Sequence, residues 1–197
     1  LAIASFWLAL MLQYLFSMEL DLLPVHGRLT QDVRPPPFFT GFYLIDSLAA
    51  GRLDLFHDAF THLVLPALTL AIGPMATIMR FTRAAVLTTL RREFVEYGRA
   101  VGYSRFRLMT KYVLRNSLIT PVTQIGLLLG GVLAGAVVVE SIYDWPGLGS
   151  YAVLAIASSD YQATLAVVLA VGVFYAIINV MVDIVHALID PRIMDQI

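Results

Sequence analysis

Four long stretches of this chain contain no Asp, Glu, Lys or Arg. They cover residues 1–18, 59–79, 116–139 and 161–182. A helix needs about 20 apolar residues to cross the hydrocarbon core of a bilayer, and a single helix satisfies its own backbone N–H and C=O groups within lipid. The four stretches therefore predict an all-α, polytopic helical membrane protein with about four transmembrane helices in this chain.

The composition agrees with a lipid environment. Only 14% of the residues are charged, against about a quarter in soluble domains, and the net charge of -1 gives no bulk basicity for binding nucleic acid. Cysteine is absent, which excludes disulfides, thiolate metal sites and a cysteine nucleophile. The chain opens at Leu1 inside an apolar stretch, without an initiator Met or a basic leader, so we expect a domain over residues 1–197 that is truncated at its N-terminus.

The charges between the four stretches are sharply segregated. The connection 80–115 carries 9 of the 13 Lys and Arg residues, 140–160 carries none, and 19–58 is net acidic. Basic loops stay on the cytoplasmic side of a membrane. We therefore expect 80–115 to be cytoplasmic, 19–58 and 140–160 to be external, and the C-terminal tail to return to the cytoplasm.

The cytoplasmic connection has the pattern of a helix, a turn and a second helix. Apolar residues from Val86 to Val95 recur mostly at three- and four-residue intervals, which predicts one amphipathic helix over this stretch. Gly102 interrupts the pattern and predicts a tight turn, before a second helical stretch from Phe106 to Val113. Periodicity and charge alone fit a basic membrane anchor as well as a docking element.

The elbow of this hairpin and several other strings resemble one family of membrane proteins. Glu96, Gly98 and Gly102 fall on the spacing of the EAA loop, Glu-Ala-Ala followed by three residues and Gly, of ABC importer permeases. The other strings are similar to the dipeptide/oligopeptide/nickel branch of these permeases and extend over about the last 120 residues and an upstream segment. They are Leu63-Val64-Leu65-Pro66-Ala67-Leu68-Thr69-Leu70, Arg99-Ala100-Val101-Gly102, Leu114-Arg115-Asn116-Ser117-Leu118, Gly135-Ala136-Val137-Val138-Val139-Glu140, Trp145-Pro146-Gly147-Leu148-Gly149, Asp160-Tyr161 and Leu188-Ile189-Asp190-Pro191-Arg192.

The resemblance implies a multi-pass permease subunit of the cell inner membrane, with about six spans in the full chain and a cytoplasmic C-terminus. It implies two ATP-binding subunits, a second permease subunit, an extracytoplasmic solute-binding protein and a small solute, with peptide as the first choice. The implied ATPase-coupling loop comprises Glu96, Gly98, Arg99, Ala100, Val101 and Gly102. The chain has no Gly-Lys-Ser/Thr phosphate loop, so we expect ATP on the partner subunits, and no cofactor or enzymatic activity here.

A second set of residues are candidates for the translocation pathway or a gate: Gly130, Gly131, Gly135, Glu140, Asn179 and Asp183. The glycines form Gly-xxx-Gly spacings, for which close helix packing is the alternative role. Glu140 and the string from Trp145 to Gly149 fit a gate or a docking surface, or a Pro-Gly turn that Tyr143 and Trp145 anchor at the membrane interface. Asn179 and Asp183 share one helix face and fit a substrate contact, a cap or an inter-subunit hydrogen bond.

Two other functions remain open on the residues alone. A secondary carrier driven by an ion gradient needs paired charges or broken helices near the membrane midplane, and only Asn179 and Asp183 fit that pattern. A membrane hydrolase needs a motif such as Gly-x-Ser-x-Gly or His-Glu-x-x-His, and neither occurs. The four histidines have no metal-ligand spacing, so no metal site is predicted; they are His26, His57, His62 and His186.

Overall fold

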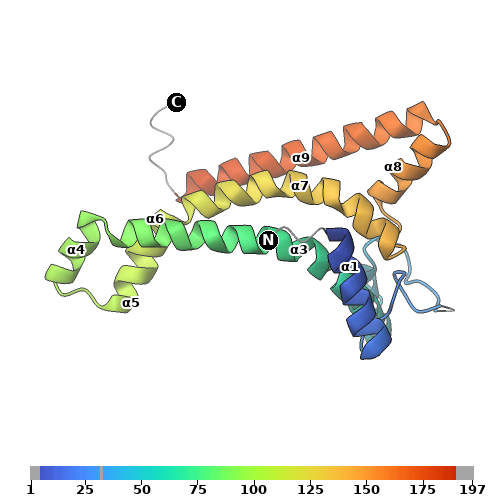
Figure 1. The fold of residues 1–197 in the computed structure, drawn as a ribbon, viewed down its shortest axis with the longest axis horizontal. Helices are drawn as coiled ribbons and strands as arrows, with labels where there is room; N and C mark the ends of the chain where they lie inside the picture. The colour runs from blue at the N-terminus through green and yellow to red at the C-terminus, as the bar shows by residue number, and fades with distance from the viewer. Residues whose placement is uncertain (1–4, 32, 190–197) are drawn as a thin grey trace. The chain divides into compact units, whose positions relative to one another are not determined.

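The computed structural model describes residues 5–31 and 33–189, and every regular element in these ranges is helical (Figure 1). The prediction of an all-α fold is confirmed. The elements are α1 (Ser5–Gln13), η1 (Tyr14–Glu19), α2 (Tyr43–Ala49), α3 (Leu53–Leu90), α4 (Glu93–Ala100), α5 (Arg105–Arg107), η2 (Leu108–Leu114), α6 (Arg115–Ser117), α7 (Ile119–Ile142), α8 (Leu148–Ala157) and α9 (Tyr161–Ile189), where η1 and η2 are π-helical. Residues 1–4 of the first predicted span, and Asp190 to Arg192 of the last string, lie outside the described residues.

Three of the described helices are long and apolar enough to cross a membrane: α3, α7 and α9. The first predicted span forms α1 and η1, which together are helical over residues 5–19. The three long helices also extend beyond the predicted spans, most of all α3, because the few charged residues at a membrane boundary do not end a helix. The predicted external connection 140–160 contains the short apolar helix α8.

The chain forms two compact units. The first contains the described residues up to Gly73 together with Leu133–Val167, and the second contains Pro74–Val132 and the described residues from Val168 onwards. Each unit holds parts of α3, α7 and α9, so the three long helices each contribute to both.

Tyr143 is the centre of the first unit. Its side chain is 2% exposed and packs with Ala9, Leu65 and Val139. Its hydroxyl donates to the carbonyl of Ala9 at 3.2 Å and lies 3.0 Å from Thr69 Oγ1. Thr69 Oγ1 in turn donates to the carbonyl of Leu65 at 2.9 Å, so either hydroxyl can be the donor in the contact between Thr69 and Tyr143. The interpretation of Tyr143 as an anchor at the membrane interface is therefore wrong, since the ring is enclosed by protein.

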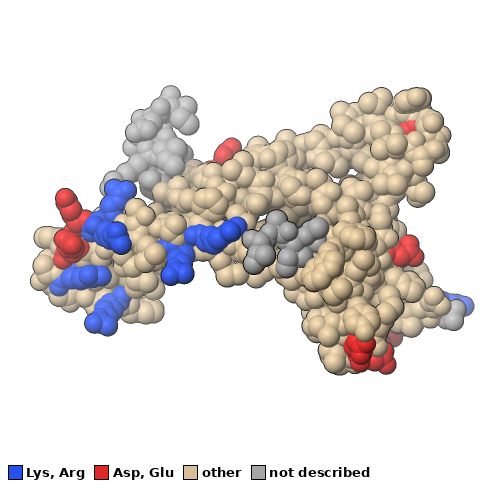
Figure 2. Space-filling model, in the orientation of Figure 1, with Lys and Arg blue, Asp and Glu red and all other residues tan. Residues whose placement is uncertain are grey.

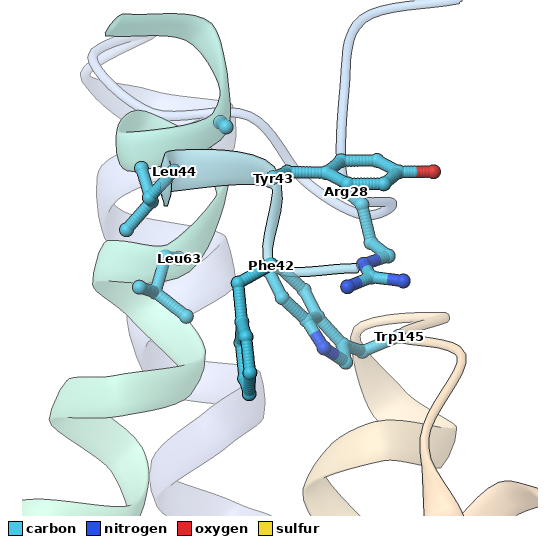
Figure 3. A pocket seen from close by; sticks show the side chains of 7 residues that line it. Arg28, Phe42, Tyr43, Leu44, Leu63 and Trp145 are labelled. Carbon is cyan, nitrogen blue, oxygen red and sulfur yellow. The ribbon is translucent and has the colours of Figure 1, made fainter. Parts of the chain in front are cut away.

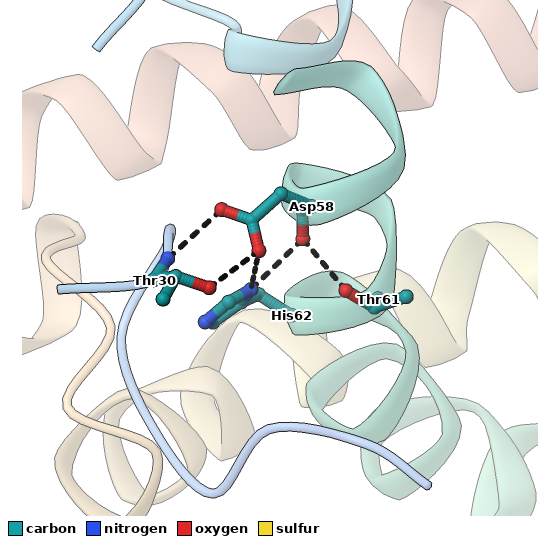
Figure 4. Close-up of polar contacts among 4 residues, drawn as sticks. All are labelled: Thr30, Asp58, Thr61 and His62. Atoms are coloured by element: carbon teal, nitrogen blue, oxygen red, sulfur yellow. Dashed lines mark hydrogen bonds and ion pairs between the residues drawn. The ribbon is translucent and has the colours of Figure 1, made fainter. Parts of the chain in front are cut away.

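A polar cluster attaches the long loop before α2 to the start of α3 (Figure 4). The N–H and the hydroxyl of Thr30 donate to the two carboxylate oxygens of Asp58, at 2.9 and 2.7 Å. His62, one turn along α3 and 6% exposed, has Nδ1 at 2.8 Å from the carbonyl of Asp58 and at 3.5 Å from its carboxylate. Both carboxylate oxygens thus hold a loop residue 28 positions away in sequence.

A buried carboxylate holds the turn that leads into α2. Asp46 is 1% exposed. It accepts the N–H and the hydroxyl of Thr40, both at 2.8 Å, and the N–H of Gly41 at 3.0 Å. Burial raises the pKa of the Asp46 carboxyl, but the hydrogen bonds from Thr40 and Gly41 together outweigh burial and leave the pKa below its ordinary value.

Acid is therefore expected to destabilise this turn. Because the folded pKa of Asp46 is lowered, its stabilising contribution is complete above the ordinary Asp pKa of about 4 and is lost as the pH falls through the folded value. In Asp46→Asn that contribution is missing at every pH. The thermal midpoint of the purified full-length protein should then be lower at neutral pH and fall less on acidification than in the wild type. Equal acid-induced shifts in both proteins would contradict this assignment.

Candidate functional site: a basic helical hairpin

The second unit contains the predicted hairpin, but its first helix is interrupted. α3 ends at Leu90, Arg91 and Arg92 form a turn, and α4 starts at Glu93. The prediction of one amphipathic helix through this stretch is therefore wrong. Glu93 and Glu96 place two carboxylates in the first turn of α4, where the helix dipole favours negative charge, so a new helix start is favourable here.

A small core holds the two arms of the hairpin together. Val95 of α4 is 1% exposed, and Leu108 and Val113 of η2 are 5% and 0% exposed. Gly98 of α4 faces the second arm, and a Cβ at this position would lie 2.6 Å from Leu108 Cδ2 and 3.4 Å from Tyr103 Cδ2. The absence of a side chain at Gly98 therefore permits the close approach of α4 to η2.

The elbow between the arms is fixed by backbone conformation and by aromatic stacking. Gly102 has a φ of +88°, which confirms the predicted tight turn, and nothing lies within 4 Å of its Cβ position. Ser104 Oγ caps the next helix by accepting the N–H of Arg107 at 3.3 Å. The rings of Tyr103 and Tyr112 stack with centroids 5.8 Å apart, and the Arg107 guanidinium lies 4.7 Å from the Tyr103 centroid. A hydrogen bond with Tyr103 raises the pKa of Tyr112 above its ordinary value.

Substitution of Gly102 tests the elbow. A β-branched residue at positive φ is strained, and left-handed backbone costs ordinary residues about 1–2 kcal/mol. Gly102→Val should therefore open the elbow and speed tryptic cleavage at its arginines in the purified full-length protein. Gly102→Asn is the matched control, because asparagine tolerates this conformation, and it should be cleaved at nearly the wild-type rate. Equal cleavage rates for the two variants would show that the turn is not formed.

The tip of the hairpin exposes apolar side chains in a basic surface. Tyr97 is 70% exposed, Val101 52% and Phe106 79%. Figure 2 shows basic side chains gathered over the part of the second unit that contains α4 and α5. The exposed basic residues from the end of α3 to the middle of η2 are Arg91, Arg92, Arg99, Arg105, Arg107 and Lys111. Of the predicted coupling residues, Gly98 is buried, and the others lie at the surface: Glu96, Arg99, Ala100, Val101 and Gly102.

The glycines of α7 in the second unit differ in how closely other residues approach them. A Cβ at Gly126 would lie 3.2 Å from Val182, and one at Gly130 would lie 3.1 Å from the ring of Tyr175. These two glycines therefore let α7 and α9 pack closely, as a Gly-xxx-Gly spacing predicts. Gly131 has nothing within 4 Å of its Cβ position.

The polar residues of α9 have different surroundings. Asn179 Nδ2 donates to the carbonyl of Tyr175 at 2.9 Å, so its amide is engaged by its own helix. His186 Nε2 lies 3.2 Å from Thr123 Oγ1 of α7. Asp183 is exposed and forms no hydrogen bond or ion pair with the part of the chain that the structure describes. A carboxylate on a membrane-spanning helix is costly without a partner.

Glu140 of the first unit caps a neighbouring helix. The N-cap of α8 is Gly147, which has no side chain to accept a hydrogen bond. Glu140 Oε2 instead accepts the N–H of Ser150 at 2.7 Å, in the first turn of α8. A Cβ at Gly147 would overlap the Glu140 carboxylate, and one at Gly149 would lie 2.7 Å from Val137 Cα. The absence of side chains at Gly147 and Gly149 therefore leaves space for the Glu140 carboxylate and for the backbone of α7.

Gly135, also in the first unit, makes only an ordinary contact, with Leu70 at 3.8 Å from its Cβ position. Two of the six predicted pathway residues, Gly130 and Asn179, lie next to the same residue: the Cβ position of Gly130 faces the ring of Tyr175, and the amide of Asn179 donates to its carbonyl. The hydrogen bond by which Glu140 caps α8 could not be predicted from the sequence, in which the glycine at the N-cap was the one available signal. The pathway role of all six residues stays a prediction.

Three apolar helices of membrane-spanning length and a basic helical hairpin define a multi-pass helical membrane protein. The chain belongs to the family of binding-protein-dependent transport system inner membrane components, whose pattern matches residues 1–195. It is accordingly a multi-pass protein of the inner membrane.

Named relatives share a large part of this sequence. The chain is 42% identical over 193 residues to the di/tripeptide transport system permease protein DppB of Pseudomonas aeruginosa (97% of this chain, 56% of the relative). It is 39% identical over 189 residues to the probable D,D-dipeptide transport system permease protein DdpB of Escherichia coli K12 (96% and 56%). It is 35% identical over 195 residues to the peptide transport system permease protein SapB of Salmonella typhimurium (96% and 60%). The chain thus spans little more than half the length of these relatives.

Proposed function

We propose that this chain forms the transmembrane core of a permease subunit in an ATP-driven importer of di- or oligopeptides. It contributes half of a translocation pathway, pairs with a second permease subunit, and works with two ATP-binding subunits and an extracytoplasmic solute-binding protein. The hairpin and the C-terminus lie in the cytoplasm. The chain itself binds no ATP and catalyses no reaction.

The observation that carries this proposal is the apolar tip of a well-packed hairpin. Tyr97, Val101 and Phe106 are exposed, although Val95 and Val113 beneath them are buried. Exposed aromatic and aliphatic side chains surrounded by arginine are typical of a protein interface. A short helix of this kind fits a groove on a partner, and the basic charge of the connection supports a cytoplasmic partner.

The packing of the hairpin explains how it transmits force. When the ATP-binding subunits close on ATP, they displace α4, and the contact of Gly98 with Leu108 passes the displacement to the second arm. η2 and α6 lead directly into α7, so the motion reaches the membrane-spanning helices as a rigid-body change. The spans then alternate between outward-open and inward-open arrangements.

Peptide is proposed as the solute because the relatives named above are di/tripeptide, D,D-dipeptide and peptide permeases. Gly131 and Asp183 are the pathway candidates whose side-chain positions have no partner within the described chain. Membership of the permease family favours this function over an ion-gradient-driven carrier or a membrane hydrolase.

The absence of cysteine from the printed chain provides the test. In the full-length permease, with any further cysteine replaced, Val101→Cys places one thiol at the hairpin tip. Thr88→Cys, exposed on α3 before the turn, is the matched control. We expect Val101→Cys to cross-link to a co-purifying ATPase in a manner that depends on ATP, and Thr88→Cys to do so less.

An impermeant maleimide added from outside intact cells separates the possible results. Protection of Val101→Cys from the reagent, together with a nucleotide-sensitive cross-link, supports the coupling role. Labelling from outside would overturn the topology. A thiol that is protected but never contacts an ATPase would overturn the importer mechanism and favour the secondary carrier.

A further inference from the structure

A small cavity opens in the first unit beside the start of α2. Its volume is about 100 Å³, and its walls are mostly apolar, with Phe42, Leu44, Ala59 and Leu63 among them. Among the described residues that line it, Arg28 is the one with a charged side chain (Figure 3). The cavity is smaller than the roughly 150 Å³ that holds a benzene molecule, which suits an aliphatic side chain.

The Arg28 guanidinium lies between two aromatic rings. Its Cζ is 4.3 Å from the Tyr43 centroid and 5.5 Å from the Trp145 centroid (Figure 3). Rings stacked in this way cover the faces of a guanidinium, while its N–H donors point outwards in its plane. Within the described chain, the Arg28 side chain has no hydrogen bond or ion pair, and its Nε is buried without an acceptor. Buried donors without an acceptor are rare in native proteins.

The backbone on both sides of Arg28 is held in place. The N–H of Gly27 donates to the carbonyl of Tyr143 at 2.8 Å. Two residues after Arg28, Thr30 donates twice to Asp58. Both oxygens of that carboxylate therefore bind Thr30 and not Arg28. The guanidinium is fixed in position and has no anion among the residues that the structure describes, which is the state expected of a preorganised site that awaits one.

We propose that Arg28 and this cavity bind the C-terminal residue of a short peptide on the external side of the membrane. The guanidinium takes the carboxylate, with which it can form two parallel hydrogen bonds, and the cavity takes the side chain. The carboxylate and the side chain of a C-terminal residue are both attached to its Cα. They can therefore reach the Arg28 guanidinium and the adjacent apolar cavity at the same time. This inference rests on the proposed function in one respect, namely that peptides are the solute presented to the external side.

An anionic lipid is the alternative source of a negative group. The phosphate of phosphatidylglycerol, however, carries a polar glycerol beside it, whereas the cavity walls next to Arg28 are formed by Phe42, Leu44 and Leu63. Burying hydroxyl groups against such walls is unfavourable. The lining therefore favours the peptide, and a lipid arm in the experiment distinguishes the two.

The test is a binding titration of the full-length permease, assembled with its partner subunits in phosphatidylcholine nanodiscs without the solute-binding protein. The dipeptide Ala-Leu is added, and tryptophan fluorescence is followed because Trp145 lines the site. We expect saturable binding in the wild type and an increase in Kd of about ten- to hundred-fold in Arg28→Gln, through loss of charge-assisted hydrogen bonds. Arg34→Gln, an exposed arginine of the same connection that does not line the cavity, should leave Kd unchanged.

Two further variants keep the test decisive if Arg28→Gln folds poorly. Arg28→Lys retains a cation over both rings but lacks the planar donor fork, so its Kd should lie between those of wild type and Arg28→Gln. Leu63→Phe narrows the cavity and should weaken Ala-Leu while leaving Ala-Gly unchanged. In the wild type, the C-terminal amide of Ala-Leu should bind as weakly as Ala-Leu binds to Arg28→Gln.

The outcomes separate this site from the importer function. If wild-type cells take up Ala-Leu with ATP but Arg28→Gln binds it with an unchanged Kd, the site is wrong and the importer function stands. If wild-type cells show no peptide uptake, the importer function fails, and an Arg28-dependent response to Ala-Leu still supports the site. An Arg28-dependent response to phosphatidylglycerol, with none to Ala-Leu, assigns the cavity to lipid and overturns the proposal.

Discussion

Gly149→Ala is expected to destabilise the permease by about 1–3 kcal/mol, the range for overpacking a close contact. An alanine Cβ would lie 2.7 Å from Val137 Cα and 2.9 Å from Glu140 Oε2. The first contact is with the backbone of α7, which cannot move aside as the end of a side chain can. α8 must shift instead, and the hydrogen bond from Ser150 to Glu140 is then lost. The gain in helix propensity from Gly to Ala, at most about 1 kcal/mol, does not offset this cost.

The matched control is Gly172→Ala, in α9. Nothing lies within 4 Å of the Cβ position of Gly172, so this variant should be neutral or slightly more stable through its helix propensity. The thermal midpoint of the detergent-solubilised full-length permease, followed by tryptophan fluorescence, compares the two. If Gly149→Ala unfolds at the same temperature as Gly172→Ala, then α8 does not pack on α7 as described.

Glu140→Ala extends the same comparison without adding volume. It removes the acceptor at the N-terminus of α8, and loss of a helix cap costs about 0.5–2 kcal/mol. In a Glu140→Ala background the carboxylate contact of Gly149 is gone, but the contact with Val137 Cα remains. The double variant should therefore be less destabilised than the sum of the single variants, as expected for residues in contact.

The long helices and the elbow could be predicted from sequence because their signals are local. Charge-free runs of membrane length predict α3, α7 and α9, and the interruption of an apolar pattern at Gly102 predicts the turn. The break between Leu90 and Glu93 was missed because apolar spacing continues across it. The acidic pair Glu93 and Glu96 was the available signal, since carboxylates favour the first turn of a helix.

The contacts that build the external side could not be predicted, because they join residues far apart in sequence. Arg28, Tyr43 and Trp145 belong to three different segments, and no periodicity relates them. The burial of Tyr143 was likewise hidden, since an aromatic residue at the end of a span fits a membrane interface equally well. Only the tertiary fold decides whether such a ring faces headgroups or protein.

If the hairpin couples to ATP-binding subunits as proposed, Gly98→Val is expected to abolish ATP-driven peptide uptake while leaving the membrane-spanning helices folded. A Cβ alone would lie 2.6 Å from Leu108 Cδ2 and 3.4 Å from Tyr103, and the two methyl groups of valine add further atoms in the same gap. The end of the Leu108 side chain can shift for a single Cβ, but at 5% exposure Leu108 cannot also make room for the two methyl groups of valine. α4 must therefore separate from η2, and the hairpin no longer passes a displacement at its tip to α7.

Valine is chosen because the free energies expected for alanine at this position nearly cancel. For Gly98→Ala, the gain in helix propensity of about 1 kcal/mol nearly cancels a single contact with a flexible leucine end, so alanine would be uninformative. Thr110→Val is the matched control, since it places the same side chain on the exposed side of η2, outside the predicted coupling residues. ATPase co-purification and peptide uptake are measured for both variants. Full uptake in Gly98→Val would show that force reaches α7 by another route than the contact between α4 and η2.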